Sequence, residues 1–224
     1  MSRAVGCKIM KIIKSTGFLA LPKKGKGPAV IVLPAWWGLN NFFKNLCRRF
    51  ARNGYVAWAP DYYGEKYAST IEEAHKFKAK LNQKDVFESL LLAVEDLGYS
   101  DIVTRKTISV VGFSMGARFA LELSASKPDR ISEVVIYYGT SIVDYSKAKA
   151  AYQGHFAEQD EWFATSGVKK LNRLLQNNGQ EVTFYTYEGT EHWFFESNCK
   201  ERYKPSKANL AWRRTLEFLE THQK

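Results

Sequence analysis

The sequence predicts an α/β fold built on a mostly parallel, doubly wound sheet flanked by helices, with an antiparallel edge near the N-terminus. Two observations predict it. Short runs rich in β-branched and apolar residues alternate along the chain with longer amphipathic stretches. Several of the short runs, such as Ala29–Leu33, are apolar at consecutive positions, which is typical of strands buried on both faces of a parallel sheet.

The expected elements can be placed in order along the chain. The expected strands are Gly17–Leu21, Ala29–Leu33, Tyr55–Ala59, Thr107–Phe113, Glu133–Tyr138, Ala151–Phe156 and Val182–Tyr187. The expected helices are Asn41–Asn53, Ile71–Leu97, Met115–Ser126, Glu161–Asn178 and Pro205–Thr221. The KKGKGP connection between the first two strands is too short for a helical crossover, so we expect those two strands to form the antiparallel edge. No repeat, low-complexity tract or linker divides the chain, and we expect residues 1–224 to be a single domain.

Size and composition limit the function classes. A chain of 224 residues buries roughly 70% of its unfolded surface and needs no disulfide or metal for stability. The three cysteines, Cys7, Cys47 and Cys199, have no metal-site spacing, so we expect reduced thiols. The N-terminus lacks a signal-type apolar core and no run approaches 18 apolar residues, so we expect a cytoplasmic protein with no membrane partner. The net charge of +10 is dispersed and no nucleic-acid motif accompanies it, so we expect no nucleic-acid partner.

One strand leads directly into a serine turn that a helix follows. The Gly-x-Ser-x-Gly turn is centred on Ser114, between the expected strand Thr107–Phe113 and the expected helix Met115–Ser126. Such a turn is a nucleophile elbow, in which small residues two before and two after the serine avoid collisions with the neighbouring elements. The alternative is that Ser114 only caps the helix. We predict that Ser114 is a nucleophile.

A serine hydroxyl is a weak nucleophile and needs a base. Of the four histidines, His192 lies in a glycine-containing loop between the last expected strand and the final helix, where a base can reach the carboxyl ends of the strands. The other three lie in the C-terminal tail, in a lysine-rich helical stretch and at the end of an apolar run: His222, His75 and His155. We predict that His192 is the base.

The base needs an acid, which in elbow-type sites lies between the serine and the histidine in the chain. Asp160 follows the penultimate strand and precedes a helical pattern, so it is the preferred candidate. Asp144, one strand earlier, is the second choice, and Glu158 is the third.

The oxyanion of a tetrahedral intermediate requires backbone donors. The N–H of Met115 directly follows the nucleophile, and Trp36 is the better donor in the loop after Ala29–Leu33, because Pro34 has no N–H. Aromatic residues in the expected loops at the same sheet edge predict a substrate-binding pocket: Trp37, Tyr62, Tyr63 and Trp193. Each could instead only pack loops together.

With these residues in place, the chain resembles the dienelactone hydrolase family of the α/β-hydrolase superfamily over nearly its whole length. The similar segments are Ala35–Asn40, Ala59–Gly64, Val111–Gly116, Gly154–Phe156 leading to Asp160, and Gly189–His192. The resemblance assigns the acid to Asp160 and the base to His192. It also implies that the N–H of Trp36 is the second oxyanion donor.

The chain departs from the family at informative positions. The family's best-known members carry a cysteine where this chain has Ser114, and a glutamate that controls the thiol at the position of Ala35. Members that act on dienelactone bind the substrate carboxylate with an arginine at the position of Glu196. A second arginine and a tyrosine of that anion site match Ile71 and His75. The resemblance therefore implies hydrolysis without specificity for dienelactone.

Together these patterns predict a serine hydrolase, of the carboxylesterase or carboxymethylenebutenolidase type, that cleaves a small carboxylic ester or lactone through an acyl-enzyme. No metal or organic cofactor is expected, and we expect a monomer or weak homodimer. The alternative is a catalytically silent α/β-hydrolase scaffold that serves as a small-molecule binding or interaction module.

Overall fold

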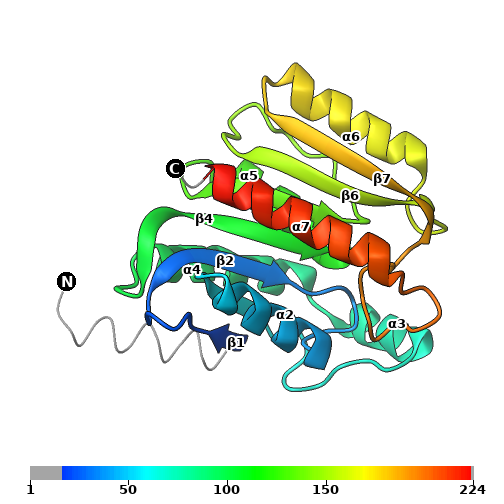
Figure 1. Cartoon of the computed structure of the whole chain (residues 1–224), viewed down its shortest axis with the longest axis horizontal. Coiled ribbons are helices and arrows are strands. Elements are labelled where there is room, and N and C mark those ends of the chain that lie inside the picture. The colour runs from blue at the N-terminus through cyan, green and yellow to red at the C-terminus, as the bar shows by residue number, and fades with distance from the viewer. Residues whose placement is uncertain (1–16, 223–224) are drawn as a thin grey trace. The chain divides into compact units, whose positions relative to one another are not determined.

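The computed structural model of the protein describes residues 17–222 (Figure 1). Its strands are β1 (Gly17–Ala20), β2 (Gly27–Leu33), β3 (Val56–Pro60), β4 (Val103–Phe113), β5 (Ile131–Tyr137), β6 (Ala151–Gln159) and β7 (Val182–Glu191). Its helices are α2 (Asn41–Arg52), α3 (Ile71–Lys80), α4 (Gln83–Gly98), α5 (Met115–Ser126), α6 (Thr165–Asn177) and α7 (Pro205–His222). The strands are hydrogen-bonded in the order β1-β3-β2-β4-β5-β6-β7.

The chain divides into two compact units, Met1–Val110 and Val111–Lys224, and the division falls inside β4. The expectation of one domain over residues 1–224 stays a prediction. Cys7, which we expect to be a reduced thiol, lies outside the described residues. So does the N-terminal sequence, which we expect not to be a signal peptide. Within the described part of the chain, no helix has both the length and the apolar character needed to cross a membrane.

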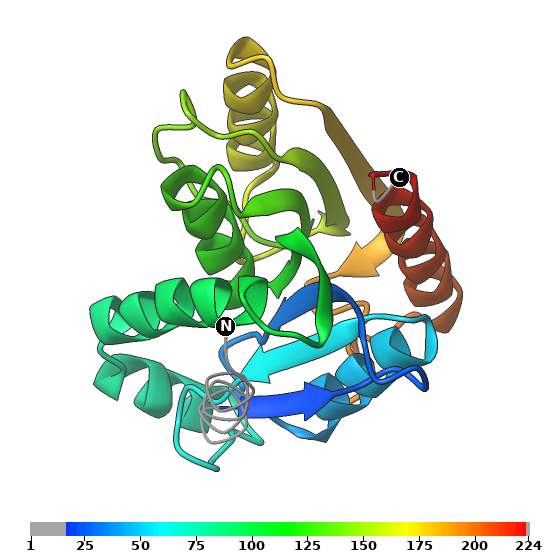
Figure 2. The same cartoon turned by 90° about the vertical axis from the view of Figure 1, so that its left-hand side faces the viewer.

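In the first unit, β2 and β3 are parallel neighbours, with Ala29 paired with Val56. The edge strand β1 runs antiparallel to β3, and Gly17 pairs with Pro60. Helices α2 and α4 lie on opposite sides of these strands (Figures 1 and 2). The core here is formed by consecutive buried positions such as Val30–Leu33, as expected for a strand covered on both faces.

In the second unit, β5, β6 and β7 are parallel neighbours in that order. Helices α5 and α7 lie on opposite sides of them (Figure 2). The β5 positions Val134–Tyr137 are fully buried, which again fits a strand covered on both faces. The predicted fold class, a mostly parallel, doubly wound sheet with an antiparallel N-terminal edge, is confirmed.

Two details of the expected fold are wrong. The first strand forms the antiparallel edge but pairs with β3 rather than with β2. The reason is that β2 already has β3 on one side and β4 on the other, so the free edge position lies beyond β3. The short connection reverses the chain direction without making the two strands neighbours.

The second error concerns the expected helix Ile71–Leu97, which is two helices. The backbone of Leu81 is extended, with φ −76° and ψ 121°, and ends α3. Asn82 then caps α4, because its side chain accepts a hydrogen bond from the N–H of Lys84 at 3.1 Å. The apolar periodicity continues across this break, so periodicity alone could not reveal it.

Candidate active site

Ser114 lies at the turn between β4 and α5 in a conformation that is strained for a residue with a side chain. Its φ is +51° and its ψ is −110°, and such backbone geometry costs about 1–3 kcal/mol. Its N–H donates to the carbonyl oxygen of Tyr137 at 3.0 Å. This bond to the end of β5 holds the strained turn in place.

Two glycines allow the turn to pack closely. A Cβ at Gly112 would lie 2.4 Å from the carbonyl oxygen of Gly116, and one at Gly139 would lie 2.6 Å from the carbonyl oxygen of Ser114. Both distances are too short for a carbon atom, so both positions require glycine. Gly112 belongs to the serine motif that the sequence revealed, whereas Gly139 follows the neighbouring strand.

The structure brings together the three side chains that the sequence analysis proposed as nucleophile, base and acid. The Nε2 of His192 lies 3.0 Å from the Oγ of Ser114, and its Nδ1 lies 2.8 Å from the Oδ2 of Asp160. The His192 side chain is 1% exposed and that of Asp160 is 6% exposed. Ser114 makes no side-chain capping bond to α5, so its hydroxyl is directed to the histidine rather than to the helix backbone.

The carboxylate of Asp160 is held on both sides. Its Oδ2 contacts His192, while its Oδ1 accepts the backbone N–H groups of Trp162 and Phe163 at 2.9 Å and 3.0 Å. The other two acidic candidates point elsewhere. Asp144 is exposed and accepts the N–H of Ser146, and Glu158 accepts the N–H of Gly189.

His155, the histidine nearest to Asp160 in sequence, is a core residue. It is fully buried in β6, and its ring nitrogens contact the Tyr187 hydroxyl at 2.7 Å and the Gln153 Oε1 at 2.9 Å. Burial, with a smaller contribution from the Arg214 guanidinium, lowers the pKa of His155 to about 3. It is therefore neutral at physiological pH and satisfied within the core.

Aromatic rings surround His192. Trp193 lies 4.8 Å from it between ring centroids, Tyr138 lies 4.7 Å away, and Phe163 stacks on it at 5.7 Å. These contacts limit rotation of the imidazole. The sequence predicts a substrate-binding role for Trp193. Its side chain is 4% exposed and packs against His192, and a role toward substrate stays a prediction.

A buried carboxyl lies behind Tyr138. The Oε1 of Glu196 accepts a hydrogen bond from the Tyr138 hydroxyl at 2.7 Å, and the Glu196 side chain is fully buried. Burial raises the pKa of Glu196 to about 8, against the opposing effect of the Tyr138 hydrogen bond. Tyr138 itself has a φ of +37°, an uncommon value for a non-glycine residue. The sequence drew attention to Glu196 only because dienelactone-cleaving members of the family carry an arginine at that position. No local pattern in the sequence indicates its pairing with Tyr138.

The expected oxyanion donors lie in different units. Met115 is the first residue of α5, where the backbone N–H has no acceptor within the helix. In the first unit, Trp36 is 5% exposed, and its carbonyl oxygen accepts the Tyr63 hydroxyl at 3.0 Å. Trp37 and Tyr62 are also buried there. The roles of these residues toward an oxyanion or a substrate stay predictions.

No group of three or more His, Cys, Asp or Glu side chains lies where it could hold a metal ion within residues 17–222. Cys47 and Cys199 are free thiols, and Cys47 is buried.

The fold and the strained serine turn together define the class of this protein, an α/β-hydrolase. A solved structure of a putative dienelactone hydrolase from Klebsiella pneumoniae is similar, with a TM-score of 0.75 and 23% sequence identity over 89% of this chain and 90% of that one. The model of the dienelactone hydrolase family matches residues 16–223, and the chain belongs to that family.

Two relatives illustrate the membership. The chain is 32% identical over 219 residues to protein usf of Aquifex pyrophilus, covering 94% of each chain. It is 28% identical over 224 residues to a putative carboxymethylenebutenolidase of Aquifex aeolicus, covering 95% of each. The predicted family and the predicted class of enzyme, a hydrolase acting on ester bonds, are thereby confirmed.

Proposed function

We propose that this hydrolase cleaves carboxylic esters or lactones through an acyl-enzyme formed on Ser114. The observation that carries the proposal is the pair of bonds made by His192, whose Nε2 contacts the Ser114 hydroxyl while its Nδ1 contacts Asp160. A histidine placed in this way can take the hydroxyl proton as the oxygen attacks a carbonyl. Asp160 keeps the imidazole in the required orientation and stabilises the imidazolium that forms.

The chemistry proceeds in two halves. The Ser114 oxygen forms a bond to the carbonyl carbon, and the N–H of Met115, the first residue of α5, stabilises the tetrahedral oxyanion. The family resemblance implies the N–H of Trp36 as a second donor. Each such donor is worth about 3–4 kcal/mol in comparable sites. The carbon–oxygen bond to the leaving alcohol breaks as His192 donates its proton to that oxygen. A water molecule then gives a proton to His192 as its oxygen bonds to the acyl carbon. The bond between that carbon and the Ser114 oxygen breaks as His192 returns the proton to Ser114, which releases the acid. No step needs a cofactor.

The substrate class follows from the charges that this chain lacks. Where dienelactone-cleaving members of the family place an arginine, Glu196 is fully buried and bonded to Tyr138. At the positions of the second arginine and the tyrosine stand Ile71, which is half-exposed, and His75. We therefore propose a neutral or aromatic short-chain ester or lactone as the substrate.

The direct test is labelling with a fluorophosphonate, which reacts with serines that a base activates. Mass spectrometry of the digested protein should find the phosphonyl adduct on Ser114, and pre-incubation with an ester substrate should slow its formation. The Ser114→Ala variant serves as the matched control. A folded wild-type protein that stays unlabelled would favour the silent-scaffold alternative.

A further inference from the structure

Arg202 links the loop that carries Asp160 to the loop that carries His192. Its Nη2 donates to the Oε1 of Glu161 at 3.2 Å, and its Nη1 donates to the Oε2 of Glu191. Glu161 directly follows Asp160, and Glu191 directly precedes His192. One guanidinium thus holds the immediate sequence neighbours of both side chains.

The backbone around Arg202 is itself fixed. The N–H of Arg202 donates to the carbonyl oxygen of Cys199 at 3.0 Å, and the N–H of Tyr203 donates to the same oxygen at 2.9 Å. The N–H of Lys204 donates to the carbonyl oxygen of Phe194 at 3.0 Å. The guanidinium therefore projects from a hydrogen-bonded turn segment just before α7.

The strand ladder alone does not hold the two loops. The pairing of β6 with β7 ends at Gln159 and Glu191, and Asp160 and His192 are the first residues beyond it. Phe163 also joins the loops, because its ring stacks on His192. The ion pairs of Arg202 with Glu161 and Glu191 add a polar connection between the loops.

We propose that Arg202 is a positioning residue that keeps Asp160 and His192 at hydrogen-bond distance during catalysis. This inference rests on the proposed function. The planar guanidinium offers separate N–H groups to two carboxylates at once, which a lysine cannot match in geometry. Because both nitrogens are already engaged, the charge of Arg202 is balanced by Glu161 and Glu191 rather than left to bind a substrate carboxylate.

The expected signature is a catalytic effect without a large effect on stability. The Arg202 side chain is 31% exposed, and those of Glu191 and Glu161 are 38% and 56% exposed, so the ion pairs contribute little to the free energy of unfolding. Catalysis is more sensitive, since a displacement of 1 Å can cost about 100-fold in rate. Partial loosening of the loops should thus lower kcat while the melting temperature changes little.

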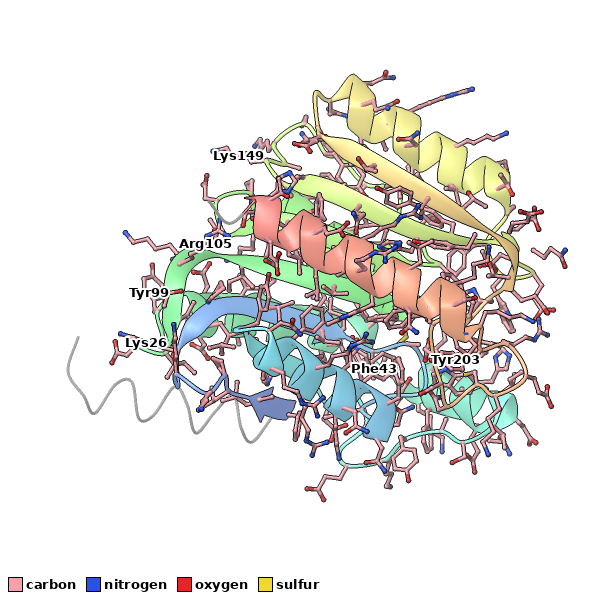
Figure 3. All side chains as sticks on the ribbon, in the orientation of Figure 1. Lys26, Phe43, Tyr99, Arg105, Lys149 and Tyr203 are labelled. Atoms are coloured by element: carbon pink, nitrogen blue, oxygen red, sulfur yellow. The ribbon has the colours of Figure 1, made fainter. Side chains whose placement is uncertain are left out.

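The experiment compares Arg202→Gln with Arg202→Lys and a matched control, Lys149→Gln. Lys149 makes an exposed ion pair with Asp129 at 2.7 Å just before β6 begins, whereas Asp160 follows the end of β6. Figure 3 shows Lys149 and Tyr203, the neighbour of Arg202, at opposite ends of the second unit.

With p-nitrophenyl acetate, Arg202→Gln should lower kcat about 5- to 30-fold with KM nearly unchanged. Arg202→Lys should recover part of the loss, and Lys149→Gln should match the wild type.

Two further measurements separate positioning from a general structural role. The losses caused by Glu161→Gln and Arg202→Gln should be less than additive, because both break the same contact. At about 1 M NaCl, where the Debye length is about 3 Å, kcat of the wild type and of Lys149→Gln should fall more than kcat of Arg202→Gln. If Arg202→Gln does not fold, kcat of Glu161→Gln and of Glu191→Gln can be compared with that of Lys149→Gln instead, because each of these variants removes one of the two ion pairs of Arg202.

The outcomes distinguish this inference from the proposed function. Labelling of Ser114 in the wild type with unchanged kcat in Arg202→Gln would overturn the role of Arg202 and leave the proposed function standing. A raised KM for a carboxylate-bearing lactone alone, with unchanged kcat on the neutral ester, would make Arg202 a substrate-anion site instead. A wild type that fluorophosphonate does not label would overturn the proposed function itself.

Discussion

Asp160 and His192 each follow directly on one residue of the last register pair between β6 and β7, Gln159 and Glu191. The register shifts just before this pair. From the pair Ala157–Tyr187 to the pair Gln159–Glu191, β6 advances by two residues and β7 by four. Gly189, with a φ of +67°, lies in this extra turn, and its N–H donates to Glu158. Without the irregularity, His192 would lie two residues, or about 7 Å, beyond Asp160.

Removing the Ser114 hydroxyl should abolish turnover. Ser114→Ala should reduce kcat on p-nitrophenyl acetate by about 10⁴- to 10⁶-fold, and His192→Ala should cost a similar factor, because members of such a set act as a unit. The measurement is steady-state kinetics on protein purified from a host that lacks competing esterases, with circular dichroism to check the fold. Activity in Ser114→Ala equal to that of the wild type would place the nucleophile elsewhere.

The acid can be identified by comparing two aspartates. Asp160→Asn should lower kcat by about 10⁴-fold, because the imidazole loses its orienting acceptor and its counter-charge. Asp144→Asn should be nearly silent, since the Asp144 side chain is exposed and its hydrogen bonds come from the nearby Ser146. A greater loss in Asp144→Asn than in Asp160→Asn would contradict the assignment.

Glu196 should make stability depend on pH. Burial raises its pKa from 4.5 to about 8, so between these values the folded state retains a proton that the unfolded state has released. The free energy of unfolding contributed by this group is therefore fully present below about pH 4.5 and is lost as the pH rises through 8. Over this pH range, the free energy of unfolding should fall by about 3–5 kcal/mol because of Glu196.

Glu196→Gln should remove this dependence. His155, whose pKa is lowered, acts in the opposite direction below pH 6.5, so the informative quantity is the difference between variant and wild type. In urea unfolding from pH 5 to pH 8.5, that difference should grow in favour of the variant as the pH rises. Glu217→Gln, on the exposed side of α7, is the control. A difference that stays constant across the range would show that Glu196 is ionised throughout.

Substrate charge should decide specificity. A dienelactone carries a carboxylate that needs a cationic partner, and burying it unpaired is costly. Because Glu196 is buried and Arg202 is engaged by two carboxylates, phenyl acetate should be preferred over dienelactone in kcat/KM. A missing charge-assisted hydrogen bond is worth about 1.5–3 kcal/mol, or about 10- to 150-fold. Both substrates should be measured with one enzyme preparation; a clear preference for dienelactone would mean that another cation completes an anion site.

Much of the candidate site was predictable because its signals are local. The serine turn, the loop after β7 and the loop after β6 can each be located by a strand pattern followed by a break. That Ser114, His192 and Asp160 would converge followed from the rule that parallel strands end at the same edge of a sheet. Gly139 and Tyr138 were missed, because their roles depend on a neighbouring strand that no local pattern identifies.

The sequence by itself determined the alternation of strands and helices, the serine turn, and the loops that carry Asp160 and His192, since each of these depends on residues close together in the chain. Only the tertiary structure decided that β1 pairs with β3, that the Gly189 irregularity aligns His192 with Asp160, and that Arg202 joins their loops. These features depend on which strand edge is free and on side chains tens of residues apart. Periodicity and turn chemistry describe single elements, and only packing selects their partners.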